Sequence, residues 1–195
     1  MHIHLLGPSG SGTSTLGKAI STECNYPWFD SDDFFWMKTD QPFSVKRKRD
    51  ERIEMLKSTL EMNDNWVLSG NITGWGDFLR NQFDLVIYKY VDPEIRIERL
   101  NRREKDRFGK RIDYGNDMYE NHVKFIEWAR SYENGDMNMR SKLSENEWMK
   151  DLKCEILRFD GINELNDEVD IVISRIKKII EQSLQPDNLP CHGSC

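Results

Sequence analysis

The sequence has no long apolar run. No stretch approaches the roughly 18–20 residues that cross a bilayer, and the apolar segment Ile3–Leu6 is far too short for the core of a signal peptide. Internal repeats and low-complexity tracts are also missing. We therefore expect a cytoplasmic protein without a membrane-spanning segment, and the length of 195 residues fits a single compact domain.

Cysteine is scarce, and its spacing matches no disulfide framework. Two of the four cysteines, Cys24 and Cys154, are isolated, and the other two lie near the end of the chain. This pattern is typical of reduced thiols in a cytoplasmic protein.

A surplus of positive charge is missing as well. The formal net charge is −6 and the pI is near 5.3, whereas a protein that grips a nucleic-acid backbone normally presents a basic face. The basic run Lys46–Arg52 and the later arginines favour a nucleic-acid function, but the acidic total disfavours it. Small-molecule chemistry fits the composition better.

Segments typical of strands alternate with segments typical of helices, which favours a parallel α/β sheet with helices on both faces. The predicted strands are Ile3–Leu6, Trp28–Asp30, Trp66–Gly70, Leu85–Val91 and Cys154–Phe159. The predicted helices run from Thr13 to about Thr22, over Ile53–Leu60, from Pro93 through an arginine-rich segment, from Asn116 to about Tyr132, and along the apolar stripe Leu165–Ile180. We assign residues 1–182 to one domain and residues 183–195 to a loose tail.

The turn between the first strand and the first helix is rich in glycine. Against the phosphate-binding pattern G-x-x-x-x-G-K-[ST], Gly7, Gly12 and Ser14 are in register, but Thr13 occupies the lysine position. Backbone N–H groups of such a turn, together with the positive end of the helix, hold phosphates, and Ser14 would offer its hydroxyl to Mg²⁺. The sequence therefore predicts a phosphate-binding loop that lacks its main charge.

Arginines after the fourth strand are candidates to supply the missing charge. Lys18 projects from a different face of the first helix and is a poor replacement. Arginine offers a planar, bidentate grip on phosphate. A solvated helix face, interleaved with glutamates, is the alternative explanation for these residues. The candidate catalytic cations are Arg99, Arg103, Arg107 and Arg111.

Three aspartates, Asp30, Asp32 and Asp33, lie at the carboxyl end of the second strand, where open α/β sheets bind ligands. In an extended segment Asp30 and Asp32 would face one side and Asp33 the other. Such a carboxylate could help to hold Mg²⁺ or accept the proton of an attacking hydroxyl. We favour Asp32 and Asp33 over Asp30, and helix capping in a solvated turn is the alternative.

An acceptor pocket is expected beyond the third strand, where Gly70 would let a substrate lie against the backbone. Trp36 and Trp75 could form its walls by stacking on a flat group. Burial in the core is the alternative for both tryptophans.

The loop Gly7-Pro8-Ser9-Gly10-Ser11-Gly12-Thr13-Ser14-Thr15-Leu16-Gly17 resembles that of P-loop kinases built like adenylate and shikimate kinases. Within them it is most similar to a bacterial subgroup whose loop has the pattern G-x-S-G-S-G-T-[ST]-T-L-G. The similarity continues through the segments 30–36, 107–111, 115–119, 128–132 and 157–161, and covers nearly everything up to about residue 182.

The resemblance implies a three-layer P-loop fold with a five-stranded parallel sheet in the order 2-3-1-4-5 and an arginine-bearing lid at about residues 100–117. It implies adenine binding near Asp160 and Gly161, and Mg²⁺ held by Ser14 and Asp32. The residues expected to bind the ATP phosphates are Gly7, Ser9, Gly10, Ser11, Gly12, Thr13, Ser14 and Thr15.

These observations favour an ATP- and Mg²⁺-dependent kinase that transfers a γ-phosphoryl group to a nucleotide, a nucleoside or another small hydroxylated acceptor. The alternative is a nucleotide-binding regulatory protein or weak ATPase, because Thr13 and Ser69 stand where adenylate kinases carry charged residues. We expect a monomer or homodimer with a small-molecule acceptor and with neither a membrane nor a nucleic-acid partner.

Overall fold

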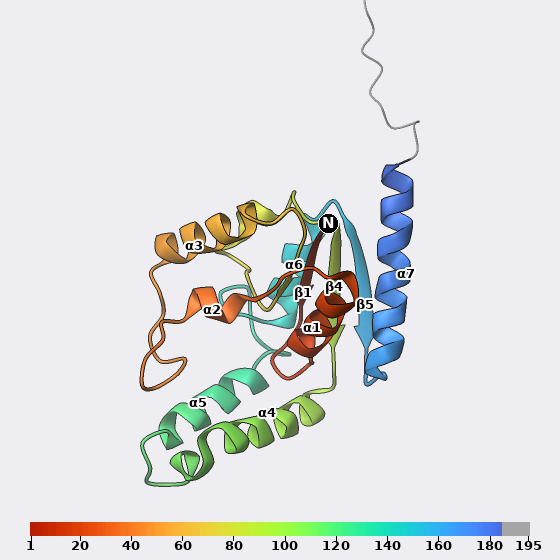
Figure 1. Cartoon of the computed structure of the whole chain (residues 1–195). Helices are drawn as coiled ribbons and strands as arrows, with labels where there is room; N and C mark the ends of the chain where they lie inside the picture. The colour runs from red at the N-terminus through yellow and green to blue at the C-terminus, as the bar shows by residue number, and fades with distance from the viewer. Residues whose placement is uncertain (185–195) are drawn as a thin grey trace, which may run out of the picture.

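A five-stranded parallel sheet forms the centre of the computed structural model, which describes residues 1–184 (Figure 1). Its order, β2-β3-β1-β4-β5, confirms the prediction. The strands are β1 (His2–Leu6), β2 (Trp28–Asp30), β3 (Trp66–Ser69), β4 (Leu85–Tyr90) and β5 (Glu155–Asp160). Because all neighbours pair in parallel, the carboxyl ends of the strands meet at one edge of the sheet.

Helices cover both faces of this sheet and extend beyond its edge. One face carries α1 (Thr13–Cys24) and α7 (Leu165–Ser183), and the other carries α3 (Arg49–Glu61) and α6 (Lys142–Lys150) (Figure 1). An arm leaves the carboxyl edge, with α4 (Pro93–Phe108) and α5 (Tyr119–Arg130) side by side. The short helices are α2 (Ser31–Phe35), η1 (Asp77–Leu79) and η2 (Gly109–Ile112).

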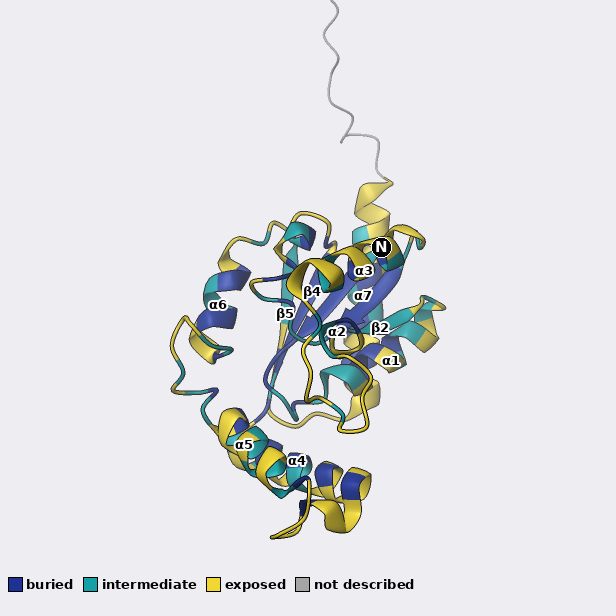
Figure 2. Cartoon of the chain, turned by 90° about the vertical axis from the view of Figure 1, so that its left-hand side faces the viewer, coloured by how far each residue is buried: buried dark blue, intermediate teal, exposed yellow. Residues whose placement is uncertain are grey.

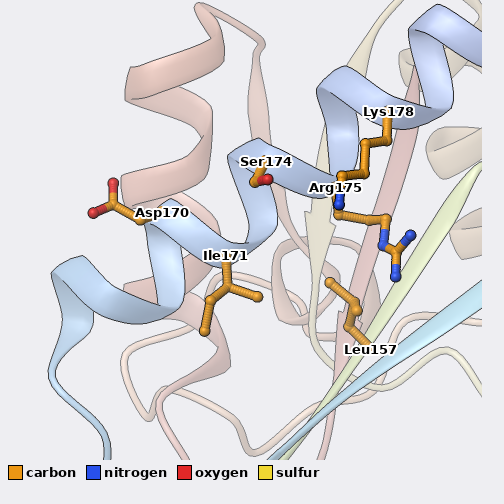
Figure 3. Close-up of a pocket in the computed structure, with 6 residues that line it drawn as sticks. All are labelled: Leu157, Asp170, Ile171, Ser174, Arg175 and Lys178. Atoms are coloured by element: carbon orange, nitrogen blue, oxygen red, sulfur yellow. The ribbon is translucent and has the colours of Figure 1, made fainter.

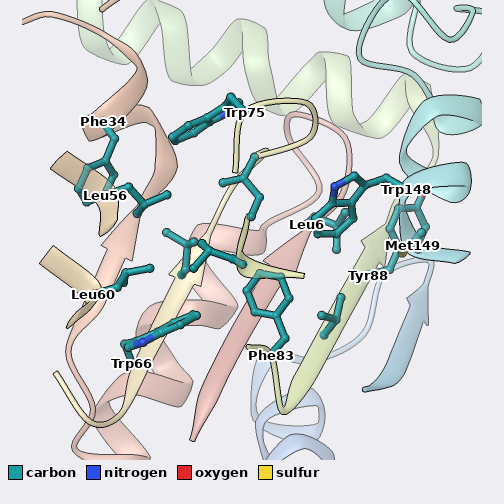
Figure 4. Close-up of a cluster of buried hydrophobic side chains, with 14 residues drawn as sticks. Leu6, Phe34, Leu56, Leu60, Trp66, Trp75, Phe83, Tyr88, Trp148 and Met149 are labelled. Carbon is teal, nitrogen blue, oxygen red and sulfur yellow. The ribbon is translucent and has the colours of Figure 1, made fainter. Parts of the chain in front are cut away.

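Two hydrophobic cores hold the three layers together. Since side chains alternate along a strand, Trp66 and Leu68 of β3 pack towards α3, whereas Val67 packs towards α1 and α7. Figure 4 shows the first cluster, which includes Trp75 and Trp148. The central strands β1, β3 and β4 are mostly buried, whereas the arm of α4 and α5 mixes buried, intermediate and exposed residues (Figure 2).

Some predicted elements differ from the observed ones. The segment after β2 is not extended but forms α2, and the side chain of Asp30 caps this helix by accepting a hydrogen bond from the N–H of Asp32 at 3.0 Å. The helix predicted from Asn116 begins only at Tyr119, because a turn precedes it. The helix α6 was not predicted. Of the predicted tail, residues 185–195 lie outside the described part of the chain.

Two general predictions concern cysteine and membranes. Cys24 and Cys154 are free thiols. Within residues 1–184, no helix combines the length and the apolar content that a membrane crossing needs.

Candidate functional site

The glycine-rich loop lies directly on neighbouring backbone. Gly7, Gly10 and Gly12 all adopt positive φ angles, of 146°, 85° and 96°, which L-residues with a side chain rarely adopt. A Cβ on Gly7 would lie 2.1 Å from the carbonyl oxygen of Lys89, and one on Gly10 would lie 2.8 Å from that of Arg96. A residue with a side chain therefore cannot replace Gly7 or Gly10 unless β4 or α4 moves.

The mouth of the loop has the features of an anion site. Gly12 is the N-cap of α1, and no side chain caps the helix or places an acidic group in its first turn. Its first amides are therefore free to bind an anion. Ser11 is fully buried, and its Oγ has no hydrogen-bond partner among residues 1–184. These residues fit the phosphates of ATP, because a phosphate would supply the missing acceptors.

Arg96 of α4 binds the backbone of the glycine-rich loop. Its side chain is completely buried, with Nη1 donating to the carbonyl of Ser9 at 3.0 Å and Nε to that of Val91 at 3.0 Å. Nη2 forms an ion pair with Glu133 at 2.5 Å. Every part of this guanidinium is thus used in holding the loop against α4, which indicates a structural role.

Arg140 binds the same loop from the segment before α6. It donates to the carbonyl of Gly7 and, at 3.5 Å, to Oγ of Ser9. Fully buried Glu145 accepts from its Nε at 2.9 Å, and the guanidinium lies 5.9 Å from the ring centroid of Trp128. Arg140 was not predicted from the sequence, because it lies in an irregular segment with no motif around it.

Two of the predicted cations, Arg99 and Arg103, lie near the loop and the carboxylates. Arg99 Nη1 is 3.5 Å from the carbonyl oxygen of Gly10. Desolvation by the surrounding protein lowers the pKa of Arg103, while the nearby charges of Asp32 and Asp30 oppose this effect. The fold thus brings a cation from α4 next to the carboxylates after β2.

The other two predicted cations lie farther along the arm. The Arg107 guanidinium is 5.0 Å from the ring centroid of Phe43, in the segment between α2 and α3. Arg111 forms an exposed ion pair with Asp117 at 2.6 Å, which raises the pKa of Arg111. Arg107 therefore links the arm to the segment between α2 and α3, whereas the hydrogen bonds of Arg111 stay within the arm.

Asp30, rather than Asp32, contacts the predicted metal ligand on α1. Ser14 Oγ donates to Asp30 Oδ2 at 3.1 Å. Desolvation and the charge of Asp32 raise the pKa of Asp30, although hydrogen bonds from Asp32 and Ser14 lower it. A hydroxyl and a carboxylate at this separation fit the oxygen chemistry of Mg²⁺.

Asp32 and Asp33 lie in the first turn of α2 and remain exposed. Protein atoms nevertheless surround the Asp32 carboxyl closely, and this desolvation raises its pKa. The positive charges of Arg140 and Arg103 act in the opposite direction. Asp32 is therefore the carboxylate that lies near cations from two separate elements.

Ser69 takes part in the packing of α1. Its Oγ accepts from Trp28 Nε1 at 3.0 Å and donates to the carbonyl of Thr13 at 3.3 Å. A Cβ on Gly17 would lie 2.2 Å from this oxygen. Ser69 thus holds the start of α1 on β3 and brings no charge to the loop.

Aromatic residues and one arginine lie together where the sequence predicts an acceptor pocket. Trp75 is 5% exposed and belongs to the core, whereas Trp36 is partly exposed beside Phe35. The Arg52 guanidinium lies 4.2 Å from the ring centroid of Phe35 and 5.7 Å from that of Trp75. The Nε of Arg52 is buried and has no hydrogen-bond partner in the described part of the chain. Gly70, with a φ of 106°, begins the loop that leads to Trp75.

The residues predicted near adenine follow β5. Asp160 is exposed, and the N–H of Gly161 donates to the carbonyl of Tyr90 at 3.0 Å, so they lie at the same sheet edge as the loop. Thr15 is exposed on α1.

A separate hollow of about 380 Å³ lies between β5 and α7 (Figure 3). Its lining contains none of the residues described above; it is formed by Leu157, Asp170, Ile171, Ser174, Arg175 and Lys178. The glycine-rich loop and this hollow are therefore distinct parts of the surface.

The strand order, the loop after β1 and the helix that follows define a P-loop kinase fold. The AAA domain family matches residues 3–124, which are more than half of the chain. The chain belongs to this family, within the P-loop nucleotide kinase-like class.

Individual relatives agree with this assignment. The protein named "Uncharacterized protein YqaC" of Bacillus subtilis is 40% identical over 172 residues, covering 88% of this chain and 95% of the relative. A cytidylate kinase of Archaeoglobus fulgidus is 30% identical over 115 residues, or 53% of this chain and 62% of the kinase. A gluconokinase structure from Sinorhizobium meliloti superposes over 94% of this chain and 97% of its own with a TM-score of 0.53 and 16% identity, a similarity of fold alone.

Proposed function

We propose that this protein is an ATP- and Mg²⁺-dependent kinase that phosphorylates a small acceptor. The observation that carries the proposal is the uncapped start of α1, where free amides meet the glycine loop and Ser14 contacts Asp30 at 3.1 Å. ATP bound there would supply the phosphoryl group, and the bound Mg²⁺ would neutralise phosphate charge.

Each part of the site has a role in this proposal. The backbone of residues 7–15 holds the phosphates, and Ser14 with Asp30 or Asp32 holds the metal ion. Arg103 and Arg107 belong to a lid at about residues 100–117, which closes and excludes water, and Arg99 lies just before this segment. Arg111 is a further cation of this lid. Asp160 and Gly161 lie near the adenine.

The reaction moves one phosphoryl group between two oxygens. The bond from the γ-phosphorus to the bridging oxygen breaks, ADP leaves, and a bond to the acceptor oxygen forms. Where the acceptor is a hydroxyl, its proton passes to the carboxylate of Asp32, with Asp33 as the second candidate. The raised pKa of Asp32 supports a role as proton acceptor.

The acceptor side favours a ligand with a flat and an anionic part. The unpartnered Nε of Arg52 can donate to a phosphate or carboxylate, and the neighbouring aromatic rings can cover a flat group. A nucleotide has both, and the name of the A. fulgidus cytidylate kinase agrees with that choice.

ADP formation with a panel of nucleotides, nucleosides and small alcohols tests the proposal. We expect Gly12→Val to lower turnover at least 100-fold, because a side chain there strains the backbone and fills the loop. Thr22→Val, on the exposed side of α1, is the control and should match the wild type. Equal turnover by Gly12→Val and the control would contradict the assignment of the loop.

A nucleotide-binding regulatory protein or weak ATPase is the second candidate. The uncharged Thr13 and Ser69 favour it. ATP binding without acceptor-dependent ADP formation across the whole panel would support this alternative.

A further inference from the structure

The loop has no cation at its usual position. Thr13 brings no charge, and the ammonium of Lys18 lies 4.5 Å from the ring centroid of Trp28, on an exposed part of α1. The buried guanidinium of Arg96 is fully engaged with carbonyls and Glu133. Neither Lys18 nor Arg96 is therefore placed to bring a mobile positive charge to the start of α1.

Lys89 lies against this part of the loop. It follows Leu85 and Ile87 on the face of β4 that packs on α1 and α7, and it is only 7% exposed. A Cβ on Gly12 would lie 3.4 Å from Lys89 Cε. The backbone of Lys89 also contacts Gly7. Both its main chain and its side chain thus touch the phosphate-binding turn.

Among the residues that the structure describes, the ammonium of Lys89 has one charged partner, Glu168. This glutamate is 1% exposed, lies in the first turn of α7 and also accepts a hydrogen bond from Asn163 at 3.2 Å. Taking two charges out of water carries a desolvation cost that an apolar pair of similar volume avoids. A purely packing role therefore gives no reason for a lysine here.

We propose that Lys89 is the phosphate-binding cation of this protein, supplied from β4 in place of the loop lysine. Its ammonium is one bond beyond Cε, so rotation of its flexible stem moves it from Glu168 to the phosphates held at Gly12. Glu168 is a positioning residue that holds the ammonium beside the loop. The inference rests on the proposed function, because it assumes that a polyphosphate binds the loop.

Calorimetry with Mg·ATP and with magnesium tripolyphosphate tests this assignment without requiring turnover. We expect Lys89→Met to weaken the binding of both at least tenfold, because a charged hydrogen-bond donor to phosphate is lost. Lys18→Met removes the same charge from α1 and should bind both as the wild type does. Because Lys89→Met leaves Glu168 buried without a partner, the variant Lys89→Met with Glu168→Gln is measured in parallel.

A rescue experiment separates phosphate binding from a structural role. Adding Thr13→Lys to the double variant restores a lysine at the usual loop position, and we expect it to recover most of the lost affinity. Unchanged affinity in Lys89→Met, or no recovery with Thr13→Lys, would overturn the inference while leaving the proposed function intact. If the wild type itself bound neither ligand, the proposed function would fail, and the inference with it.

Discussion

Asp30 and Asp32 show how two adjacent carboxylates acquire different roles. Asp30 caps α2 and accepts from Ser14, whereas Asp32 lies near Arg103 and Arg140. The sequence placed both on one side of an extended segment, and the short helix α2 overturns that geometry. The helix turns the backbone at Ser31, so the two side chains meet different partners.

Asp32→Asn is expected to stabilise the protein and lower its activity. The pKa of Asp32 is raised in the folded protein, so ionisation of this carboxyl group lowers stability. This loss of stability is absent below the pKa that Asp32 has in the unfolded chain, and it develops as pH rises through the pKa of the folded protein. In denaturant unfolding at pH 7, Asp32→Asn should have a higher free energy of unfolding than the wild type, and this difference should disappear near pH 3. Its rate of phosphoryl transfer should be lower than that of the wild type. Asp40→Asn, in an exposed loop, is the control. A less stable Asp32→Asn at pH 7 would contradict the assignment.

His4 should make stability fall with acid. It is fully buried with an unpartnered Nε2, and desolvation lowers its pKa to about 4. The unfolded chain binds a proton near pH 6.5, so stability declines as pH falls from there towards 4, by about 2 kcal/mol at pH 5. His4→Phe, which keeps a ring against Phe83, should reduce this decline in denaturant unfolding at pH 7.5 and 5.0. If His4→Phe and the control His2→Phe lost the same stability between pH 7.5 and 5.0, the assignment of this decline to His4 would be wrong.

At the scale of elements, local patterns predicted the sheet well. Each strand is a short apolar run, and the observed boundaries differ from the predicted ones by about a residue. The helices α2 and α6 escaped prediction because they are short and lack a sustained apolar period. Their existence depends on capping by Asp30 and Ser141 and on burial against distant segments.

Much of the candidate site depends on contacts that a sequence does not display. The glycine loop is local and was predicted from spacing. By contrast, Arg140 reaches Gly7 across 133 positions of the chain, and Asn71 reaches Glu145 across 74. Lys89 was missed because a lysine at the end of an apolar strand shows no sign of its partner Glu168.

We expect that the close packing of α1 on β3 requires glycine at position 17. A Cβ there would lie 2.2 Å from Ser69 Oγ and 2.9 Å from Trp28 Nε1. Gly17→Ala should therefore lower the free energy of unfolding by about 1–3 kcal/mol through overpacking, despite the better helix propensity of alanine.

Ser69→Ala supplies the matched background for this test. Without the hydroxyl the new methyl group has more room, so Gly17→Ala should cost clearly less in that background. A double-mutant cycle measures the coupling, and additive effects would contradict the proposed contact.

At the scale of the whole molecule, the arm and the segment between α2 and α3 already touch through Arg107 and Phe43. If the arm acts as a lid, Mg·ATP should slow hydrogen exchange not only at residues 7–16 but also at residues 105–118 and 38–46. Residues 174–183 of α7 serve as an internal control. Protection confined to residues 7–16 would show that the arm does not respond to the nucleotide.

The position of Trp128 beside Arg140 has a practical consequence. This indole is 39% exposed, and its π-face lies near a guanidinium that also contacts the loop. Any anion that draws the guanidinium away would alter the electrostatic surroundings of the chromophore and so its emission. We therefore expect an anion bound at the loop to change the tryptophan emission, and Trp128→Phe identifies the share of Trp128 in this signal.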